Sequence, residues 1–197
     1  MTDIFGAEAA LRAQADEMVA RLRLPDRLAR IGRPVRVGSS ALGLMVRPDI
    51  DITTICARLD ADALAAVAAL GAELMAESEV VEAVRFRNDT GPWNREPEAY
   101  PDGLYLGLTA RLPQGPRWTF DLWFVDQPER QPDLRHLETL LPRLTEESRA
   151  SILGIKTLLA GRQDAARPPS ALVYEAVMEH GVRSVEAFDD WLARRQG

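Results

Sequence analysis

"VRVGSSALGLMVRPDIDITTIC", residues 35–56, sets a Gly-Ser-Ser turn ahead of two aspartates that lie two positions apart in an otherwise apolar stretch. The alternating, β-rich segment DIDITTI, residues 49–55, predicts a strand. Side chains two positions apart in a strand point to the same face, so Asp49 and Asp51 project together and the isoleucines project to the other side. The stretch therefore predicts two carboxylates on one face of a sheet.

Two carboxylates in this position need a positive partner. Like charges on a packed sheet repel, and each costs several kcal/mol to desolvate when nothing compensates it. Mg²⁺ is a natural partner, because it prefers one or two carboxylate ligands and takes the remaining ligands from water and substrate phosphate. Taken alone, the aspartate pair is therefore either a solvated strand edge or a metal site that also meets a phosphate.

The turn before the aspartates predicts a binding site for that phosphate. Gly38 lets the backbone come close to an anion, and Ser39 or Ser40 can cap a short helix that runs to about Met45. The first N–H groups of a helix favour negative charge. Arg47, just before the aspartates, can add a positive charge.

A third acid bears on whether the turn and the aspartate pair form a metal and phosphate site. The segment RWTFDLWFVD, residues 117–126, predicts an apolar strand with Asp121 in its middle. This carboxylate could simply accept hydrogen bonds from neighbouring backbone N–H groups. If the strand instead lies beside residues 49–55, three carboxylates meet, as in sites where two metal ions about 3.5–4 Å apart catalyse phosphoryl transfer. The combination of the three features favours the second interpretation.

The pattern along the whole chain predicts an α+β fold. Apolar residues at helical spacing predict helices over residues 6–24 and 64–75, and further strands are expected at about 80–87, 103–112 and 117–125. From Asp133 onward the pattern is helical. We expect an α/β core over residues 1–130 and a C-terminal helical region over residues 131–197. Composition does not decide whether this is a true domain boundary.

Composition and charge exclude several classes of function. No apolar run of the 197 residues approaches the roughly 18 needed to span a bilayer, and no signal-peptide pattern opens the chain, so we expect a cytoplasmic protein without a membrane partner. The net charge of −6 argues against strong non-specific binding to nucleic acid. The single cysteine, Cys56, excludes an internal disulfide and is expected to be buried. His136 and His180 lack metal-ligand spacing and are expected at the surface or at helix ends.

The segment VGSSALGLMVRPDIDI, followed later by FDLWF, resembles the signature of the DNA polymerase β-like nucleotidyltransferase superfamily over roughly residues 33–125. The resemblance implies a mixed β-sheet flanked by helices, and transfer of a nucleoside monophosphate from an NTP such as ATP with loss of pyrophosphate. By position it implies that Asp49 and Asp51 hold both metal ions, that Asp121 holds the catalytic ion and helps to deprotonate the acceptor hydroxyl, and that Gly38 and Ser39 hold the β- and γ-phosphates. The C-terminal helices are similar in plan to those of small antibiotic nucleotidyltransferases.

The chain also departs from the pattern of the superfamily. Many members carry an arginine soon after the Gly-Ser, where this chain has Ala41 and Leu42, and Arg47 is a candidate substitute. The same stretch resembles the GrpB-like branch, which shares the Gly-Leu and the basic-Pro pair but often lacks the first aspartate. Here Asp49 is present, which favours a competent site.

Other basic and polar segments are candidates for substrate contacts. Lys156, the only lysine among 24 basic residues, lies at the edge of an apolar helical stripe, where it could contact a triphosphate or extend past the stripe to solvent. Arg85 and Arg87 are similar candidates for triphosphate contact. The long polar segment over residues 88–103 could be an acceptor-binding lid or a simple surface loop.

The sequence thus predicts a metal-dependent nucleotidyltransferase with two Mg²⁺ ions, or Mn²⁺ in their place. Its substrates would be an NTP and a hydroxyl acceptor, which could be a small molecule, an RNA end or a protein. The alternative is a non-catalytic nucleotide-binding or regulatory module, including a toxin–antitoxin partner, with the same fold. The sequence alone does not specify the acceptor, the base of the NTP or the oligomeric state.

Overall fold

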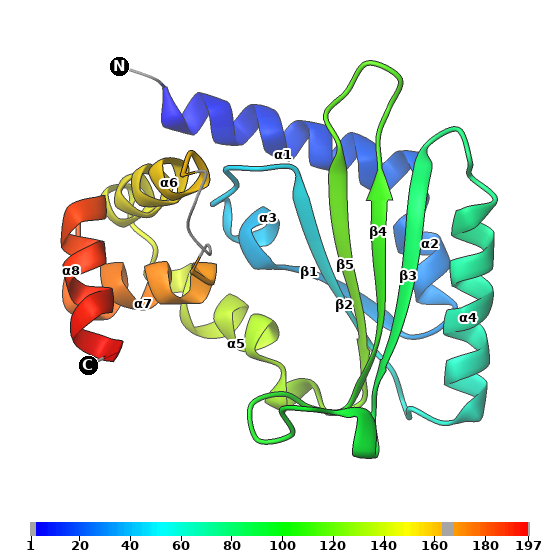
Figure 1. The fold of residues 1–197 in the computed structure, drawn as a ribbon. Coiled ribbons are helices and arrows are strands. Elements are labelled where there is room, and N and C mark those ends of the chain that lie inside the picture. Colours follow the sequence, from blue (N-terminus) through cyan, green and yellow to red (C-terminus); the bar gives the residue numbers. More distant parts are fainter. Residues whose placement is uncertain (1–2, 163–167, 197) are drawn as a thin grey trace.

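A mixed five-stranded sheet forms the centre of the computed structural model, which describes residues 3–162 and 168–196 (Figure 1). The strands are β1 (Arg33–Val37), β2 (Asp49–Ile55), β3 (Val81–Asp89), β4 (Gly103–Ala110) and β5 (Trp118–Val125). Their order is β1-β2-β5-β4-β3, in which β2 and β5 are parallel and all other neighbours are antiparallel. The predicted α+β class and mixed sheet are confirmed.

Helices precede, connect and follow the strands. They are α1 (Ile4–Arg21), α2 (Leu24–Ala29), α3 (Gly38–Leu42), α4 (Ala61–Met75), α5 (Pro132–Thr139), α6 (Glu146–Ala160), α7 (Ser170–His180) and α8 (Val185–Gln196). Short 3₁₀ turns lie at Gly91–Trp93, Pro128–Arg130 and Leu141–Arg143. Within the described residues no helix is long and apolar enough to cross a membrane.

Two local predictions near the N-terminus are wrong. The first helix ends at Arg21, because Arg23 adopts a left-handed conformation with φ 49° and starts a separate short helix, α2. The helix after the turn ends before Met45, because Gly43 is left-handed with φ 67°. Its cap position is Val37 and has no side-chain hydrogen bond, so neither serine caps it.

Alternation along the strands separates a covered face from the face that carries the acids. The even-numbered apolar residues of β2, β4 and β5, such as Ile50, Leu106 and Phe120, belong to a hydrophobic core shared with α1, α2 and α4. Cys56 lies in the same core, as predicted, and burial raises the pKa of its thiol to about 11. The odd-numbered residues, which include Asp51 and Asp121, point to the other face.

A second hydrophobic cluster joins the C-terminal helices to the turn before β2. It contains Ile152, Val177 and Phe188 from the C-terminal helices together with Leu42 and Leu44. Figure 1 shows α5–α8 grouped on the β1 side of the sheet, with α1, α2 and α4 behind or beside it. The C-terminal helices therefore lie next to the turn, on the side of the sheet that carries the acids.

Candidate active site

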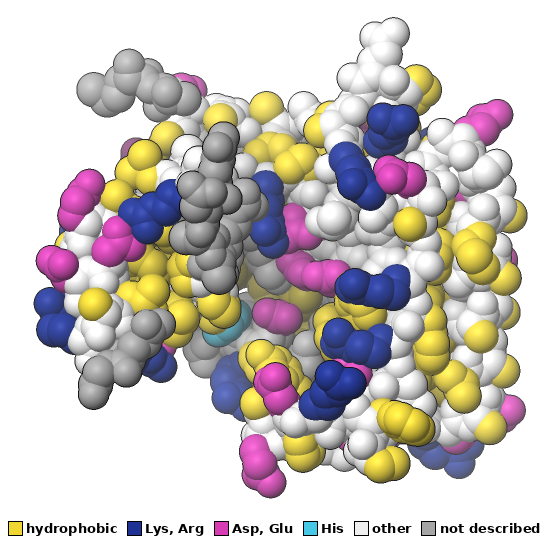
Figure 2. All heavy atoms as spheres, viewed as in Figure 1, with side chains coloured by type: hydrophobic (Ala, Val, Ile, Leu, Met, Phe, Trp, Pro, Cys, Tyr) yellow, Lys and Arg dark blue, Asp and Glu magenta, His cyan; other side chains and the backbone are white. Residues whose placement is uncertain are grey.

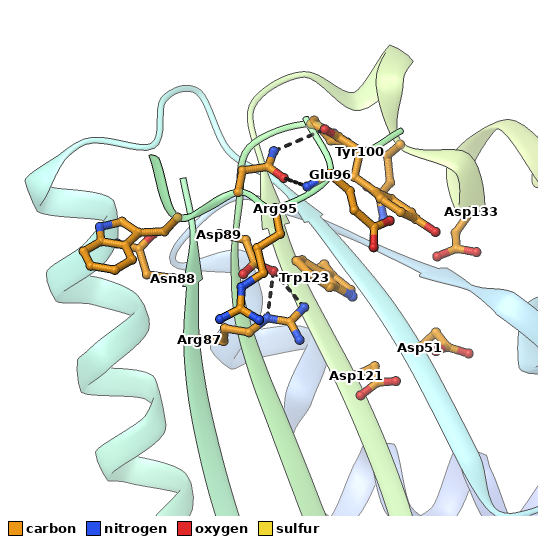
Figure 3. A pocket seen from close by; sticks show the side chains of 14 residues that line it. Asp51, Arg87, Asn88, Asp89, Arg95, Glu96, Tyr100, Asp121, Trp123 and Asp133 are labelled. Atoms are coloured by element: carbon orange, nitrogen blue, oxygen red, sulfur yellow. Dashed lines mark hydrogen bonds and ion pairs between the residues drawn. The ribbon is translucent and has the colours of Figure 1, made fainter. Parts of the chain in front are cut away.

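The strands β2 and β5 bring two of the predicted acids together. They are parallel neighbours in register, with Asp51 opposite Asp121 and Asp49 opposite Thr119. Paired residues of neighbouring strands point to the same face about 4.8 Å apart at the backbone. Figure 3 shows Asp51 and Asp121 side by side on this face. The three-carboxylate interpretation required β2 and β5 to be neighbours, and they are.

Asp51 is the carboxylate with the least compensation. It is partly buried, and it accepts no hydrogen bond from any other residue in the described part of the chain. Its pKa is raised well above the usual range, first by burial and then by the negative charges of Asp49, Asp133 and Asp121. A partly buried carboxylate with like charges around it has the electrostatics of a cation site.

Asp49 is already paired. One of its oxygens, Oδ2, accepts hydrogen bonds from Arg47 Nη2 at 2.6 Å and Nε at 3.1 Å, and the other accepts one from the Thr119 hydroxyl. No three His, Cys, Asp or Glu side chains of the described chain are arranged as a ready metal site. A metal ion bound to Asp49 Oδ2 would compete with Arg47 for that oxygen.

Asp121 is held by a residue to which the sequence analysis assigned no role. The Tyr105 hydroxyl donates a hydrogen bond to Asp121 Oδ1, and no backbone N–H of the described residues donates to this carboxylate. Burial, followed by this contact with Asp121, raises the pKa of Tyr105 to about 12, so the hydroxyl stays protonated at neutral pH. The sequence offered no signal for Tyr105, because an aromatic residue in an apolar strand is usually core.

The turn lies directly against the acids. Gly38 has φ +63°, and a Cβ at this position would lie 2.1 Å from Asp51 Oδ2. Ser39 is partly buried, and its carbonyl oxygen accepts a hydrogen bond from the Leu44 N–H. Ser40 is buried, and its hydroxyl donates to the Val37 carbonyl and accepts from Arg36. The Ser40 side chain is therefore engaged within the fold, and phosphate contacts of the turn stay predictions.

Lys156 is buried, so of the two alternatives left open by the sequence, the side chain that extends to solvent is wrong. Its Nζ donates to the Leu44 carbonyl at 2.7 Å and to the Tyr174 hydroxyl at 3.3 Å. Burial, and then the charge of Arg47, lowers the pKa of Lys156 to about 8. Contact with a triphosphate stays a prediction.

A pocket of about 720 Å³ opens above the acids (Figure 3). The long segment predicted as a lid supplies much of its wall, together with Arg87 and Trp123, whereas Arg85 does not line it. The lining residues are Asp51, Arg87, Asn88, Asp89, Trp93, Asn94, Arg95, Glu96, Tyr100, Pro101, Asp121, Trp123, Gln131 and Asp133. Figure 2 shows acidic side chains in the hollow between the C-terminal helices and the sheet, with basic side chains along the sheet side.

Asp133, in the first turn of α5, is a fourth acid that the sequence analysis missed. It lines the same pocket as Asp51 (Figure 3), and its pKa is raised mainly by burial, with His136 acting in the other direction. An acid in the first turn of a helix is common for reasons of helix stability alone, so its spacing carried no functional signal.

Comparison with known proteins gives a fold likeness only. No family model and no curated protein matches the chain. One structure of Cid1, described as having RNA terminal uridylyl transferase activity, matches with a TM-score of 0.59 and 16% identity over 87% of this chain and 47% of the Cid1 chain. A mutant of the Cid1 poly(U) polymerase bound to MgATP matches with a TM-score of 0.58 and 18% identity over 92% and 52% of the two chains.

The chain thus spans about half the length of these Cid1 chains and shares their fold. This likeness agrees with the α+β fold expected from the sequence. The resemblance to the GrpB-like branch stays a prediction.

Proposed function

We propose that this protein is a metal-dependent nucleotidyltransferase that transfers a nucleoside monophosphate from an NTP to a hydroxyl acceptor. The observation that carries the proposal is the pairing of Asp51 with Asp121 on parallel strands, directly beneath the glycine turn. Two neighbouring carboxylates next to a backbone turn that can approach a phosphate suit the chemistry of phosphoryl transfer. The fold likeness to Cid1 supports the same class of reaction.

Asp49, Asp51 and Asp121 supply the carboxylate oxygens that Mg²⁺ prefers, although they do not lie as a ready three-ligand site. Asp49 and Asp51 would hold both Mg²⁺ ions and Asp121 one of them, with Mn²⁺ as a substitute. When bound, the ions would neutralise the charge on the phosphate and on the attacking and leaving oxygens. Arg47, released from Asp49, would be free to contact the triphosphate beside Gly38 and Ser39.

The pocket is proposed as the acceptor site. Its floor contains Asp121, which would accept the proton of the attacking hydroxyl, and its wall is the segment over residues 88–103. A volume of about 720 Å³ is within the range of pockets that hold a small molecule or the end of a chain. The acceptor could be a small molecule, an RNA end or a protein.

A non-catalytic nucleotide-binding or regulatory module, such as a toxin–antitoxin partner, is the second candidate. One observation favours it: Asp49 is occupied by Arg47 and Thr119. Such a protein would bind Mg²⁺-NTP without transferring the nucleotide.

Labelled NTPs distinguish the two candidates. The protein would be incubated with Mg²⁺, each α-labelled NTP and acceptors of each class, and label transfer and pyrophosphate release would be measured. Transfer should occur in the parent and fall more than about 100-fold in Asp49→Asn and Asp51→Asn, because each change removes a metal ligand.

The matched control is Asp26→Asn, which removes one negative charge from an exposed position on α2 and should leave transfer unchanged. Both site variants should fold, since asparagine is nearly isosteric and relieves charge repulsion. Full transfer in both site variants would contradict the proposal, and calorimetric binding of NTP without any transfer would support the second candidate.

A further inference from the structure

A row of residues crosses the middle of the sheet in the register of its strands. Asp51 on β2 pairs with Asp121 on β5, which in turn pairs with Gly107 on β4. Gly107 pairs with Arg85 on β3. Because paired residues share a face, the row has two carboxylates at one end, a guanidinium at the other and no side chain at Gly107 between them.

Tyr105 occupies the space above Gly107. It lies two residues earlier on β4 and on the same face, and its side chain runs along the strand. A Cβ on Gly107 would lie 2.6 Å from the Tyr105 hydroxyl oxygen and 3.0 Å from the ring carbon Cζ. Tyr105 is 5% exposed, and its ring packs against that of Trp123 with centroids 5.0 Å apart. The missing side chain at Gly107 is therefore what lets the hydroxyl reach the row.

The Tyr105 hydroxyl connects the two ends of the row. It donates to Asp121 Oδ1 and accepts from Arg85 Nη2 at 2.9 Å. Hydrogen bonds in a chain polarise one another, so donation from the guanidinium makes the hydroxyl a stronger donor to the carboxylate. The other oxygen of Asp121, Oδ2, accepts no hydrogen bond from the described residues. One carboxylate oxygen is thus held on the β4 side, and the other is left free.

We propose that Tyr105, polarised by Arg85, is a positioning residue that presents the free oxygen of Asp121 to the metal ion shared with Asp51. The inference rests on the proposed function, since it takes Asp51 and Asp121 as ligands of that ion. Tyr105 acts through Asp121 and has no direct part in the chemistry. Residues that hydrogen-bond to a metal ligand typically change metal affinity roughly 10–100-fold when they are removed.

The test measures binding of Mn²⁺ alone to the full chain by electron paramagnetic resonance, without nucleotide or acceptor. Tyr105→Phe removes the hydroxyl and keeps the ring packing, so the Kd for Mn²⁺ should rise about 10-fold. Arg85→Met should raise it less, because the hydroxyl remains but loses its polarising donor, and Arg85→Lys should restore most of the parent affinity. In turnover assays Tyr105→Phe should raise the Mg²⁺ concentration for half-activation and leave the KM for NTP at saturating Mg²⁺ unchanged.

Tyr174→Phe is the matched control for the Mn²⁺ measurement. It also removes a buried tyrosine hydroxyl, but that hydroxyl hydrogen-bonds with Lys156 and Ser170 and with no acid of the site, so the Kd for Mn²⁺ should not change. If Tyr105→Phe loses stability but binds Mn²⁺ as the parent does, its role is structural and the inference is overturned. If Tyr105→Phe does not fold, parent-like Mn²⁺ binding by Arg85→Met overturns it instead.

The same experiment separates this inference from the proposed function. If the parent does not bind Mn²⁺, or if Asp51→Asn binds it equally well, the metal site itself is wrong. If the parent binds Mn²⁺, Asp51→Asn does not, and Tyr105→Phe binds as tightly as the parent, only the positioning role fails.

Discussion

Gly38 is the residue at which the turn and the acids meet. A glycine before Ser-Ser would ordinarily be attributed to the approach of a phosphate, but its immediate neighbour is the Asp51 carboxylate. Two separate constraints act on it: the positive φ, which disfavours any Cβ, and the distance of only 2.1 Å that an added Cβ would have to Asp51 Oδ2. A larger residue at position 38 would therefore displace the Asp51 carboxylate even when no nucleotide is bound.

Gly38→Ala should lower the free energy of unfolding by at least about 2 kcal/mol, since the left-handed conformation costs roughly 1–2 kcal/mol and the collision adds to it. Urea unfolding measures the change. The control is Gly181→Ala, which has a similar φ of +65° but no atom within 4 Å of the added Cβ, so it should show only the conformational part. Equal losses in the two variants would contradict the collision, whereas Asp51→Ala in the Gly38→Ala background should recover part of the loss.

At the scale of elements, the pairing of β2 with β5 creates the site from segments about 70 residues apart in the chain. Parallel strands cannot be joined by a hairpin, so a helix and two further strands lie between them in the sequence. The segment after β3 then closes over the acids. It is held by Asp102, which accepts hydrogen bonds from Gly91 and Asn94, and by Arg130, which donates to the Pro97 carbonyl.

This anchored segment carries an exposed aromatic residue, Trp93, on the pocket wall. Trp93→Ala should change the free energy of unfolding by less than about 0.5 kcal/mol, because the side chain is 66% exposed. It should nevertheless raise the KM for the acceptor several-fold and leave the KM for NTP unchanged, if the segment binds the acceptor. Steady-state kinetics with the acceptor found by label transfer measure both constants.

Phe86→Ala is the control for Trp93→Ala, because Phe86 is also exposed, on the neighbouring strand β3, but lies outside the pocket lining. An unchanged acceptor KM in Trp93→Ala would indicate that the segment over residues 88–103 is a surface loop without a binding role.

At the scale of the whole molecule, the C-terminal helices are connected to the site through the residues before β2. Leu42 and Leu44 contribute to the second hydrophobic cluster, and Lys156 and Arg149 donate to the carbonyl oxygens of Leu44 and Leu42. The boundary expected near residue 130 stays a prediction. These contacts show that the C-terminal helices pack against the segment that leads into Asp49.

The buried Lys156, which joins α6 to this segment, should make the free energy of unfolding depend on pH. Its pKa is lowered to about 8 from 10.5, so between pH 8 and 10 the folded protein binds fewer protons than the unfolded chain and stability should rise with pH. Relative to Lys156→Met, the free energy of unfolding of the parent should increase by about 2 kcal/mol from pH 8 to pH 10. Urea unfolding of both proteins at the two pH values tests this, and parallel changes would contradict a buried, weakly basic lysine.

Much of the fold and part of the site were predictable because their signals are local. Alternation within DIDITTI determines which residues share a face, and this holds wherever the strand is placed in the sheet. The same locality explains the errors at α2 and at the end of α3, where single left-handed residues, Arg23 and Gly43, end a helix that the apolar spacing alone would continue.

The sequence by itself determined the α+β class, the strands and the common face of Asp49 and Asp51, since these follow from side-chain periodicity along one segment. Only the tertiary structure decided that Asp51 lies beside Asp121, that Tyr105 holds Asp121 and is itself held by Arg85, and that Asp133 lines the same pocket. The physical reason is that these contacts join side chains on different strands or helices. Their distances depend on strand order and register, which the packing of the whole molecule sets and no local pattern encodes.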